Sequence, residues 1–320
     1  MGVLPRILAV VVVAWAQWAP GAAAFKFLVV GGTGRVGAST AKHLHVLSTD
    51  EGAAPCELVL GGRSAAAFER SRQRILQQLE RSQPGAAPPA ITFQELDLDT
   101  DDVGRLRAAI SSCGADCVLH TAGPFQQRTR PILLEASIAA GLPYVDVCDE
   151  PALCMSSKLL HPDAVAAGTA CVTGAGIWPG ASAIMAAEAV AELRRLEGAT
   201  KAEPCEGEDV AMSFFTAGTG GAGVTIVSAT FLLLCQAALC YEHGAARERE
   251  AWTSPRAVDF GQGVGVREVW LLDNPDVASI HDALKVAFVH NVYQYMHIYV
   301  HVHMYVHMYV HMNMHMHMHI

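Results

Sequence analysis

The sequence predicts an α/β protein in which a doubly wound parallel sheet is followed by a second, α+β domain. Between Phe25 and Thr173, apolar strand-like runs alternate with amphipathic helical stretches, an order that gives parallel strands covered by helices on both faces. The first run leads directly into the glycine-rich segment 31–37, which opens the first helical stretch. After Gly174 the alternation gives way to shorter strand-like segments and glycine-rich turns. We therefore place the domain boundary between residues 174 and 175.

Each element of the first domain follows from hydrophobic periodicity and from the turn residues that bound it. The strand-like runs lie at 25–30, 57–60, 91–97, 117–121, 144–147 and 170–173. Helical periodicity covers 36–47, 65–81, 100–112 and 130–140. Ser64 and Thr100 are the expected N-caps of the second and third helices, and Gly141 is the expected end of the fourth.

The second domain is predicted to contain a helix, several strands and a buried apolar stretch. A helix is expected at 181–196, a polar linker at 197–208, and strands at 210–216, 257–260 and 266–272. The apolar stretch from Val224 to Tyr241 approaches the ~20 residues that span a bilayer. A buried helix is favoured over a membrane span because the stretch contains polar residues, namely Thr225, Ser228, Thr230 and Gln236.

Composition excludes several classes of protein. Of the 320 residues, 52% are hydrophobic and 17% are charged, which excludes a disordered chain. The formal charge of −9 argues against a nucleic-acid partner, since surfaces that bind nucleic acids carry basic patches. The nine cysteines include no C-x-x-C pair, so reduced structural thiols are expected. No spacing typical of a metal site or of a Ser-His-Asp triad is present.

Residues 1–24 contain the parts of a secretory signal peptide. Arg6 supplies one positive charge, an apolar run extends from Ile7 to Trp15, and small residues precede Phe25. The alternative, an element of the folded domain, is disfavoured because the first predicted strand begins at Phe25. A signal-like leader that ends before Phe is also the first part of a plastid address in algae with complex plastids. A plastid and the secretory or endomembrane system are therefore both expected ahead of the cytosol.

Residues 291–320 are predicted to be a low-complexity tail. From Tyr295 to Ile320, Tyr or His alternates with Met, Ile or Val, with Asn313 as the single exception. A translated purine–pyrimidine repeat gives this pattern. We interpret the tail as an artefact of the gene model and the second domain as truncated between Ala283 and Asn291. A metal-binding histidine tract and a β-strand are the alternatives that the pattern allows.

The glycine-rich segment is the strongest motif of the sequence. Gly31-Gly32-Thr33-Gly34-Arg35-Val36-Gly37 contains the pattern G-x-G-x-x-G between a predicted strand and a predicted helix. Glycines allow a tight turn and a close approach of the backbone to a pyrophosphate, and the N-terminus of the helix attracts its negative charge. Residues 25–174 are therefore predicted to be a dinucleotide-binding domain of the Rossmann type.

The end of the second predicted strand favours NADP over NAD. An NAD site places Asp or Glu there to bind the ribose 2′-hydroxyl, whereas this chain has Gly61-Gly62-Arg63-Ser64. Arg63 is expected to bind the 2′-phosphate of NADP, with assistance from Arg35. The alternative is that Arg63 is solvated and that Ser64 only caps its helix.

Two further segments border the predicted ligand crevice, which lies at the carboxyl ends of the strands. Asp97, after the third strand, is placed either to approach the adenine or to cap its own loop. Ala122-Gly123-Pro124-Phe125 leaves the fourth strand, and its small residues would allow the nicotinamide ribose to pass close to the backbone.

Together these motifs resemble those of the saccharopine dehydrogenase-like oxidoreductases. The early motifs are the glycine-rich segment, Leu60-Gly61-Gly62-Arg63-Ser64, Ala122–Phe125 and Tyr144-Val145-Asp146. The later segments Thr216–Gly223 and Asp259–Gly265 are similar to a plant and cyanobacterial branch of that family. The resemblance covers Phe25 to Leu284 and implies an NADP-binding domain, an α+β second domain, and a chain that normally continues and returns to the first domain.

The expected function is an NADP-dependent oxidoreductase that transfers hydride to or from a small carbonyl, imine or enoyl substrate. Candidates for acid–base chemistry are Asp146, Cys148 and His120, since carboxylates beside a nicotinamide can raise one another's pKa. The structural alternatives are that Asp146 orients backbone, that Asp149 and Glu150 cap the next helix, and that His120 is a satisfied core residue.

Two other interpretations of the function stay open at this point. The chain can be an NADP-binding protein without turnover, or a protein that associates weakly with a membrane through its N-terminal segment or through residues 224–241. A homodimer is also compatible with the sequence.

Overall fold

The computed structural model describes residues 24–50, 56–126, 128–196, 209–215, 231–232, 235–286 and 288–294. The chain divides into two units, Met1–Ile177 and Trp178–Ile320. This division lies close to the change of pattern after Gly174 from which the sequence predicts a domain boundary.

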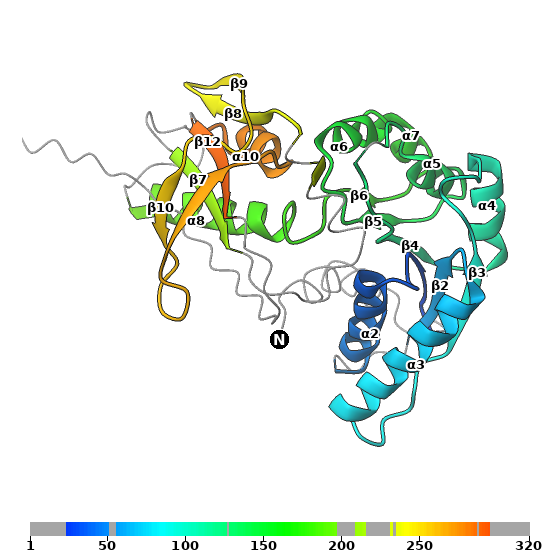
Figure 1. The fold of residues 1–320 in the computed structure, drawn as a ribbon. Coiled ribbons are helices and arrows are strands. Elements are labelled where there is room, and N and C mark those ends of the chain that lie inside the picture. The colour runs from blue at the N-terminus through cyan, green and yellow to red at the C-terminus, as the bar shows by residue number, and fades with distance from the viewer. Residues whose placement is uncertain are drawn as a thin grey trace, which may run out of the picture. The chain divides into compact units, whose positions relative to one another are not determined.

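The first unit is built on a parallel sheet in which the strands follow the order β3-β2-β1-β4-β5-β6 (Figure 1). β1 lies inside the sheet, and from it the chain runs outward through β2 and β3 and then returns to the other side of β1. This is the strand order of the dinucleotide-binding Rossmann fold, as the sequence predicts. The strands are β1 (Lys26–Val30), β2 (Glu57–Gly62), β3 (Ile91–Glu95), β4 (Cys117–His120), β5 (Tyr144–Asp146) and β6 (Cys171–Val172).

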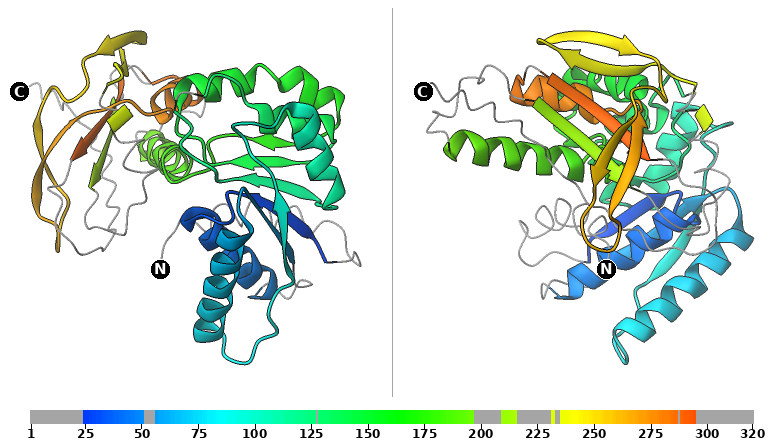
Figure 2. Two further views of the ribbon diagram at one scale, coloured as in Figure 1. Left: turned by 45° about the vertical axis from the view of Figure 1, so that its right-hand side comes forward. Right: turned by 60° about the vertical axis from the view of Figure 1, so that its left-hand side comes forward.

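Helices cover both faces of this sheet (Figure 2). One face packs against α2 and α3, and the other packs against α4, α5 and α7. The short helix α6 buries Leu153 against Phe125 and Cys148. The helices are α2 (Arg35–Asp50), α3 (Ala65–Ser82), α4 (Val103–Ser112), α5 (Ile132–Ala139), α6 (Pro151–Lys158) and α7 (His161–Ala166).

The central strand is apolar from Phe27 to Val30 because both of its faces are buried there. In β1, Phe27 and Val29 lie in the core beneath α2 and α3, while Leu28 and Val30 lie in the core beneath α4 and α5. All four side chains are at most 2% exposed. An uninterrupted apolar run is what a strand of a doubly covered parallel sheet requires.

The second unit contains a mixed sheet in which β12 is central. β12 pairs in parallel with β7 along its whole length and antiparallel with β11 and β8, in the order β10-β11-β12-β8-β9. Helices α8 and α10 pack on this sheet through Ala186, Val190, Val277 and Ile280. The elements are α8 (Ala181–Leu196), β7 (Asp209–Phe215), β8 (Ala238–Glu242), β9 (Ala245–Arg249), β10 (Arg256–Asp259), β11 (Val266–Leu271), α10 (Asp276–Leu284) and β12 (Phe288–Gln294).

Two of the sequence predictions are wrong in detail. Thr100 is not the N-cap of α4, because the helix begins at Val103 and Asp102 caps it by accepting the Arg105 N–H at 2.8 Å. The apolar stretch that ends at Tyr241 is not helical at its C-terminal end, because residues 238–242 form β8 and pair with β9 and β12. Pairing with distant strands outweighs the local pattern there.

Other sequence predictions concern residues outside the described ranges. These are the leader up to residue 23, the linker 197–208, the glycine-rich turn 218–223, residues 224–230 and the tail from residue 295. β12 ends at Gln294 and therefore crosses the boundary that the sequence predicts between residues 290 and 291. Among the helices that the structure describes, none is both long enough and apolar enough to cross a membrane.

Candidate cofactor site

The glycine-rich segment forms a tight turn between β1 and α2. The Gly34 N–H donates to the carbonyl of Gly31 at 2.8 Å, and the Gly31 N–H donates to the carbonyl of Gly61 in β2 at 3.0 Å. The turn is therefore held against the neighbouring strand. α2 begins at Arg35, so the N-terminus of this long helix, with the positive end of its dipole, follows the turn directly.

Three of the glycines are required by the fold. Gly31 has a φ of +82°, and a Cβ there would lie 2.8 Å from the backbone nitrogen of Ala122. A Cβ on Gly32 would lie 2.7 Å from the carbonyl oxygen of Val29, and a Cβ on Gly37 would overlap the carbonyl oxygen of Gly31. Any side chain at these positions would push the turn away from β1, β4 or α2.

Gly34 differs from these three glycines. It is exposed, and among the described residues a Cβ there would approach only the carbonyl oxygen of Gly31, at 3.1 Å, a contact that a small shift relieves. The fold therefore does not require glycine at this position. Open space over the turn, in front of a helix N-terminus, is what a bound pyrophosphate needs.

Two contacts fix the turn from the side of β2 and α3. A Cβ on Gly62 would lie 2.8 Å from Thr33 Oγ1, so the end of β2 packs closely against the turn. The buried Ser71 hydroxyl of α3 donates to the carbonyl of Gly32 at 3.0 Å. Sequence reasoning missed Ser71, although a signal was present. It is the hydroxyl residue in a buried helical stripe whose other members are Phe68, Ile75 and Leu79.

Arg63 follows β2 directly, at the position where the choice between NAD and NADP is expected. Its Nη1 lies 3.1 Å from Asp99 Oδ2, and Arg128 Nη2 lies 2.7 Å from Asp99 Oδ1. One carboxylate thus bridges two guanidinium groups. The side chains of Arg63 and Asp99 are 67% and 56% exposed, so both are open to solvent. Ser64 caps α3, as expected, by accepting the Ala67 N–H at 3.3 Å.

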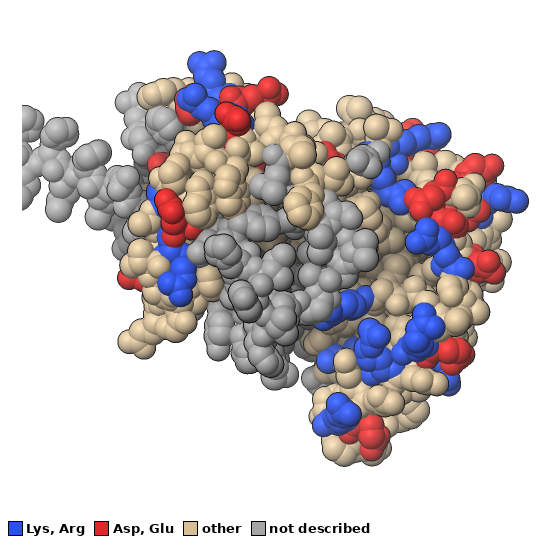
Figure 3. All heavy atoms as spheres, viewed as in Figure 1, with Lys and Arg blue, Asp and Glu red and all other residues tan. Residues whose placement is uncertain are grey.

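The charged surface of the first unit is mixed in sign on one face. On the face shown in Figure 3, Lys and Arg side chains of the first unit are interspersed with Asp and Glu side chains.

Asp97 shapes its own loop. Its Oδ1 accepts the Asp99 N–H at 3.0 Å, and its N–H donates to Asp101 Oδ2 at 2.8 Å. Of the two roles that the sequence leaves open, the structure shows the capping one. The same bonds explain why Asp101 is not available to cap α4 and why Asp102 does so instead.

The segment Ala122–Phe125 leaves β4 beside the glycine turn. The backbone of Ala122 lies against Gly31, and the Thr121 hydroxyl ties the end of β4 to β1 through a 2.9 Å hydrogen bond. The structure thus brings these two predicted parts of one site together. Phe125 is 4% exposed and packs edge-on against His120, with ring centroids 4.9 Å apart. Its ring therefore belongs to the core and not to an open crevice.

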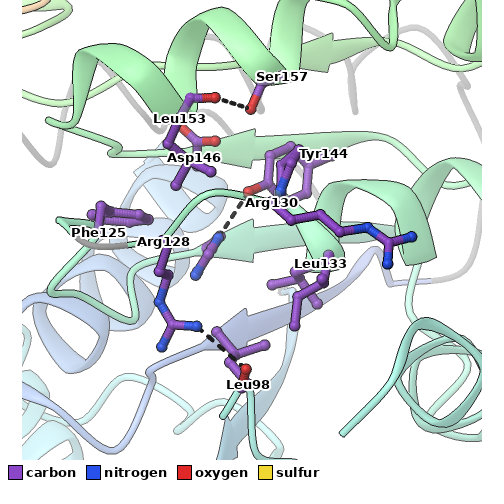
Figure 4. Close-up of a pocket in the computed structure, with 12 residues that line it drawn as sticks. Leu98, Phe125, Arg128, Arg130, Leu133, Tyr144, Asp146, Leu153 and Ser157 are labelled. Carbon is purple, nitrogen blue, oxygen red and sulfur yellow. Dashed lines mark hydrogen bonds between the residues drawn. The ribbon is translucent and has the colours of Figure 1, made fainter.

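His120 and Tyr144 line a small pocket between β4, β5 and α5 (Figure 4). His120 Nδ1 lies 2.8 Å from the Tyr144 hydroxyl, and His120 Nε2 is buried without a hydrogen-bond partner among the described residues. Burial, and after it the positive charge of Arg128, lowers the pKa of His120 to about 3. His120 is therefore a neutral core residue at pH 7.

Asp146 joins two stretches of backbone. Its Oδ1 accepts the Gly174 N–H at 2.7 Å and the Cys148 N–H at 3.0 Å. Burial raises the pKa of the Asp146 carboxyl, and these two hydrogen bonds oppose that shift. Orienting backbone is the structural alternative that the sequence left open. Glu150 likewise caps α6 by accepting the Ala152 N–H at 3.3 Å.

Cys148 is held in a buried, uncharged state. Its side chain is 1% exposed, and the neighbouring thiol of Cys154 together with burial raises the pKa of the Cys148 thiol. All eight cysteines in the described ranges are free. In those same ranges, no group of three or more His, Cys, Asp or Glu residues is arranged to hold a metal ion.

Comparisons with known proteins identify no family for this chain. No family model and no curated protein matches the chain. GenD2 from gentamicin A biosynthesis, solved in complex with NAD, is 18% identical with a TM-score of 0.39, over 86% of this chain and 67% of that chain. An NAD-binding oxidoreductase from Klebsiella pneumoniae is 16% identical with a TM-score of 0.39, over 85% of this chain and 67% of that chain.

A third similar structure is the WlbA dehydrogenase from Thermus thermophilus, solved with NAD and α-ketoglutarate. It is 12% identical with a TM-score of 0.38, over 84% of this chain and 72% of that chain. The second of these structures is named an NAD-binding oxidoreductase and the third a dehydrogenase, and the first and third contain NAD. At such identities and TM-scores, their ligands and substrates are properties of those proteins alone.

Proposed function

We propose that the chain is an NADP-dependent oxidoreductase of the saccharopine dehydrogenase-like type, acting on a small carbonyl, imine or enoyl substrate. Its pyrophosphate-binding part is the turn Gly31–Gly37 with the N-terminus of α2, and its 2′-phosphate-binding residue is Arg63. When bound, NADPH supplies the hydride. The protein holds the dinucleotide across the carboxyl ends of β1, β2 and β4.

The observation that carries this proposal is the contrast between Gly34 and the other glycines of the turn. Gly31, Gly32 and Gly37 are required by packing, whereas Gly34 is exposed and its Cβ position is nearly open. Gly34 directly precedes the N-terminus of a 16-residue helix, and the fold does not restrict this position to glycine. Phosphate oxygens can therefore approach the backbone closely there.

The preference for NADP is supported by the residues at the end of β2. Gly61 and Gly62 leave no acid to bind a ribose 2′-hydroxyl, and Arg63 presents an exposed guanidinium. A planar guanidinium binds a phosphate through two parallel hydrogen bonds, which a hydroxyl group cannot match.

A second function, NADP binding without turnover, is favoured by the state of the three acid–base candidates. His120, Asp146 and Cys148 are each at least nine-tenths buried, and the first two hold hydrogen bonds to the protein's own groups. Incubation with NADPH and a panel of small carbonyl, imine and enoyl compounds separates the two functions. Loss of NADPH absorbance with any of them supports the enzyme, and tight binding without oxidation supports the second function.

The cofactor site is tested by fluorescence titration of the full-length protein with NADPH and NADH. Gly34→Asp places a side chain and a negative charge where the pyrophosphate is proposed to lie, so we expect at least about a tenfold loss of NADPH affinity with the fold retained. Gly104→Asp is the matched control, because Gly104 is also an exposed glycine at the N-terminal end of a helix, α4. Unchanged NADPH affinity in Gly34→Asp would overturn the assigned site.

A further inference from the structure

The carboxylate of Asp99 forms an ion pair with the guanidinium group of Arg63, the group that is proposed to bind the 2′-phosphate. We propose that Asp99 is a specificity-determining residue, which competes with the 2′-phosphate of NADP for Arg63 and so weakens the preference of the protein for NADP over NAD. The inference rests on the proposed function and concerns a residue that the proposed site does not otherwise use.

Asp99 is held in place by its own loop and by Arg128. The Asp99 N–H donates to Asp97 Oδ1 at 3.0 Å, which fixes the backbone of the loop. Arg128 donates to the carbonyl of Leu98 at 3.3 Å, and to Asp99 Oδ1 at 2.7 Å. Because these bonds do not involve Arg63, the Asp99 carboxylate stays where it is when Arg63 moves.

Arg128 is also the better anchored of the two arginines. Its side chain is 24% exposed, against 67% for Arg63, and its Nε lies 3.4 Å from the carbonyl of Pro124. The flexible partner of Asp99 is therefore Arg63. An incoming anion would draw Arg63 away from Asp99 while Arg128 keeps its contacts.

The charges explain why the effect separates the two cofactors. The 2′-phosphate is a phosphate monoester with a charge of about −1.5 to −2 at pH 7, so it attracts Arg63 and competes for it with the Asp99 carboxylate. NAD carries a hydroxyl at this position and meets neither effect. Removing the charge of Asp99 should therefore strengthen NADPH binding and leave NADH binding unchanged.

The test is a titration of full-length Asp99→Asn with NADPH and NADH at low ionic strength. We expect NADPH affinity to rise about threefold to fivefold, in keeping with one exposed charge contact, and NADH affinity to stay within about twofold. Adenosine 2′,5′-bisphosphate should show the same gain, and adenosine 5′-monophosphate should not. Glu80→Gln is the control for net charge, since Glu80 is an exposed acid at the far end of α3.

A double variant makes the outcome decisive. In the double variant Arg63→Gln/Asp99→Asn the gain should disappear, because Asp99 acts on the cofactor through Arg63. Weaker NADPH binding in Asp99→Asn, or an equal change for NADH, would show that Asp99 positions its loop, and it would overturn the inference. Wild-type protein that binds neither cofactor would overturn the proposed function as well, whereas normal NADPH binding without a gain overturns the inference alone.

Discussion

The hydroxyl of Ser71 reaches from α3 to the carbonyl of Gly32, at 3.0 Å, and so joins a helix that lines the sheet to the turn proposed to hold the cofactor. Both residues are buried. In Ser71→Ala the carbonyl of Gly32 would lose this partner in an environment that water does not reach. The stability of the first unit and the shape of the turn are therefore coupled through one hydrogen bond.

We expect Ser71→Ala to lower the free energy of unfolding by about 1–2 kcal/mol and to weaken NADPH binding severalfold. Urea unfolding followed by circular dichroism, with an NADPH titration, measures both effects. Ser82→Ala is the control, because Ser82 is an exposed residue of the same helix whose hydroxyl also donates to a backbone carbonyl. Equal losses in the two variants would show that Ser71 has no particular connection to the turn.

Substitutions of Gly34 and Gly37 by alanine should differ in their effect on stability. A Cβ on Gly37 overlaps the carbonyl oxygen of Gly31, so we expect Gly37→Ala to destabilise the first unit by more than about 3 kcal/mol. Gly34→Ala should change stability by less than about 1 kcal/mol and should still reduce NADPH affinity. Thermal unfolding of both variants checks the contrast, and a stable Gly37→Ala protein would contradict the packing described for the turn.

Tyr144→Phe should destabilise the first unit through His120. The substitution removes the group bonded to His120 Nδ1, and His120 Nε2 already lacks a partner among the described residues. Leaving a buried ring nitrogen unbonded costs about 1–3 kcal/mol. Tyr241→Phe, in the second unit, provides the control in the same urea titration, because the Tyr241 ring is stacked on His281 and keeps this contact without its hydroxyl.

The stability of the second unit should depend on pH through Asp276. Burial raises the pKa of this carboxyl to about 6, although the Ser182 hydroxyl and the Gly180 N–H both donate to it. A folded-state pKa above the unfolded one means that the folded unit binds the proton more tightly. The associated stability is fully present below about pH 4 and is lost as pH rises through about 6.

Thermal unfolding of the wild-type protein between pH 4 and 7 measures this dependence, which amounts to at most about 3 kcal/mol for a shift of about two units. In Asp276→Asn the dependence should flatten, since no proton is exchanged at that position. Asp282→Asn, which removes an exposed acid of the same helix, should keep the wild-type slope. If Asp276→Asn and the wild-type protein have parallel curves, Asp276 does not titrate in this range.

The alternation of strands and helices predicted the first unit well because each of its strands carries a local apolar pattern. β1 to β6, the cap at Ser64 and the glycine turn are each determined by a short stretch of sequence. The predicted N-cap of α4 is wrong because Thr100, Asp101 and Asp102 are all suitable capping residues. The choice among them depends on Asp97, whose N–H donates to the Asp101 carboxylate.

Partners that are far apart in sequence were not predictable in the same way. The pairing of Arg63 with Asp99, 36 residues away, depends on the strand order that places β2 beside β3. β12 pairs with β7 from Phe288 opposite Asp209 to Gln294 opposite Phe215. The local sequence of either strand does not predict which strand will be its partner. A strand that adjoins a repetitive tail is also hard to separate from that tail by composition.

The central position of β12 has a practical consequence for shortened versions of the protein. Cleavage after residue 290 would remove Val292 and Tyr293, which form the pairs with Leu271 and Trp270 of β11. The hairpin of β10 and β11 would then be detached from the sheet, and β11 would present an unpaired edge to other molecules, a recognised cause of aggregation. A soluble fragment of the second unit should therefore extend at least to Gln294.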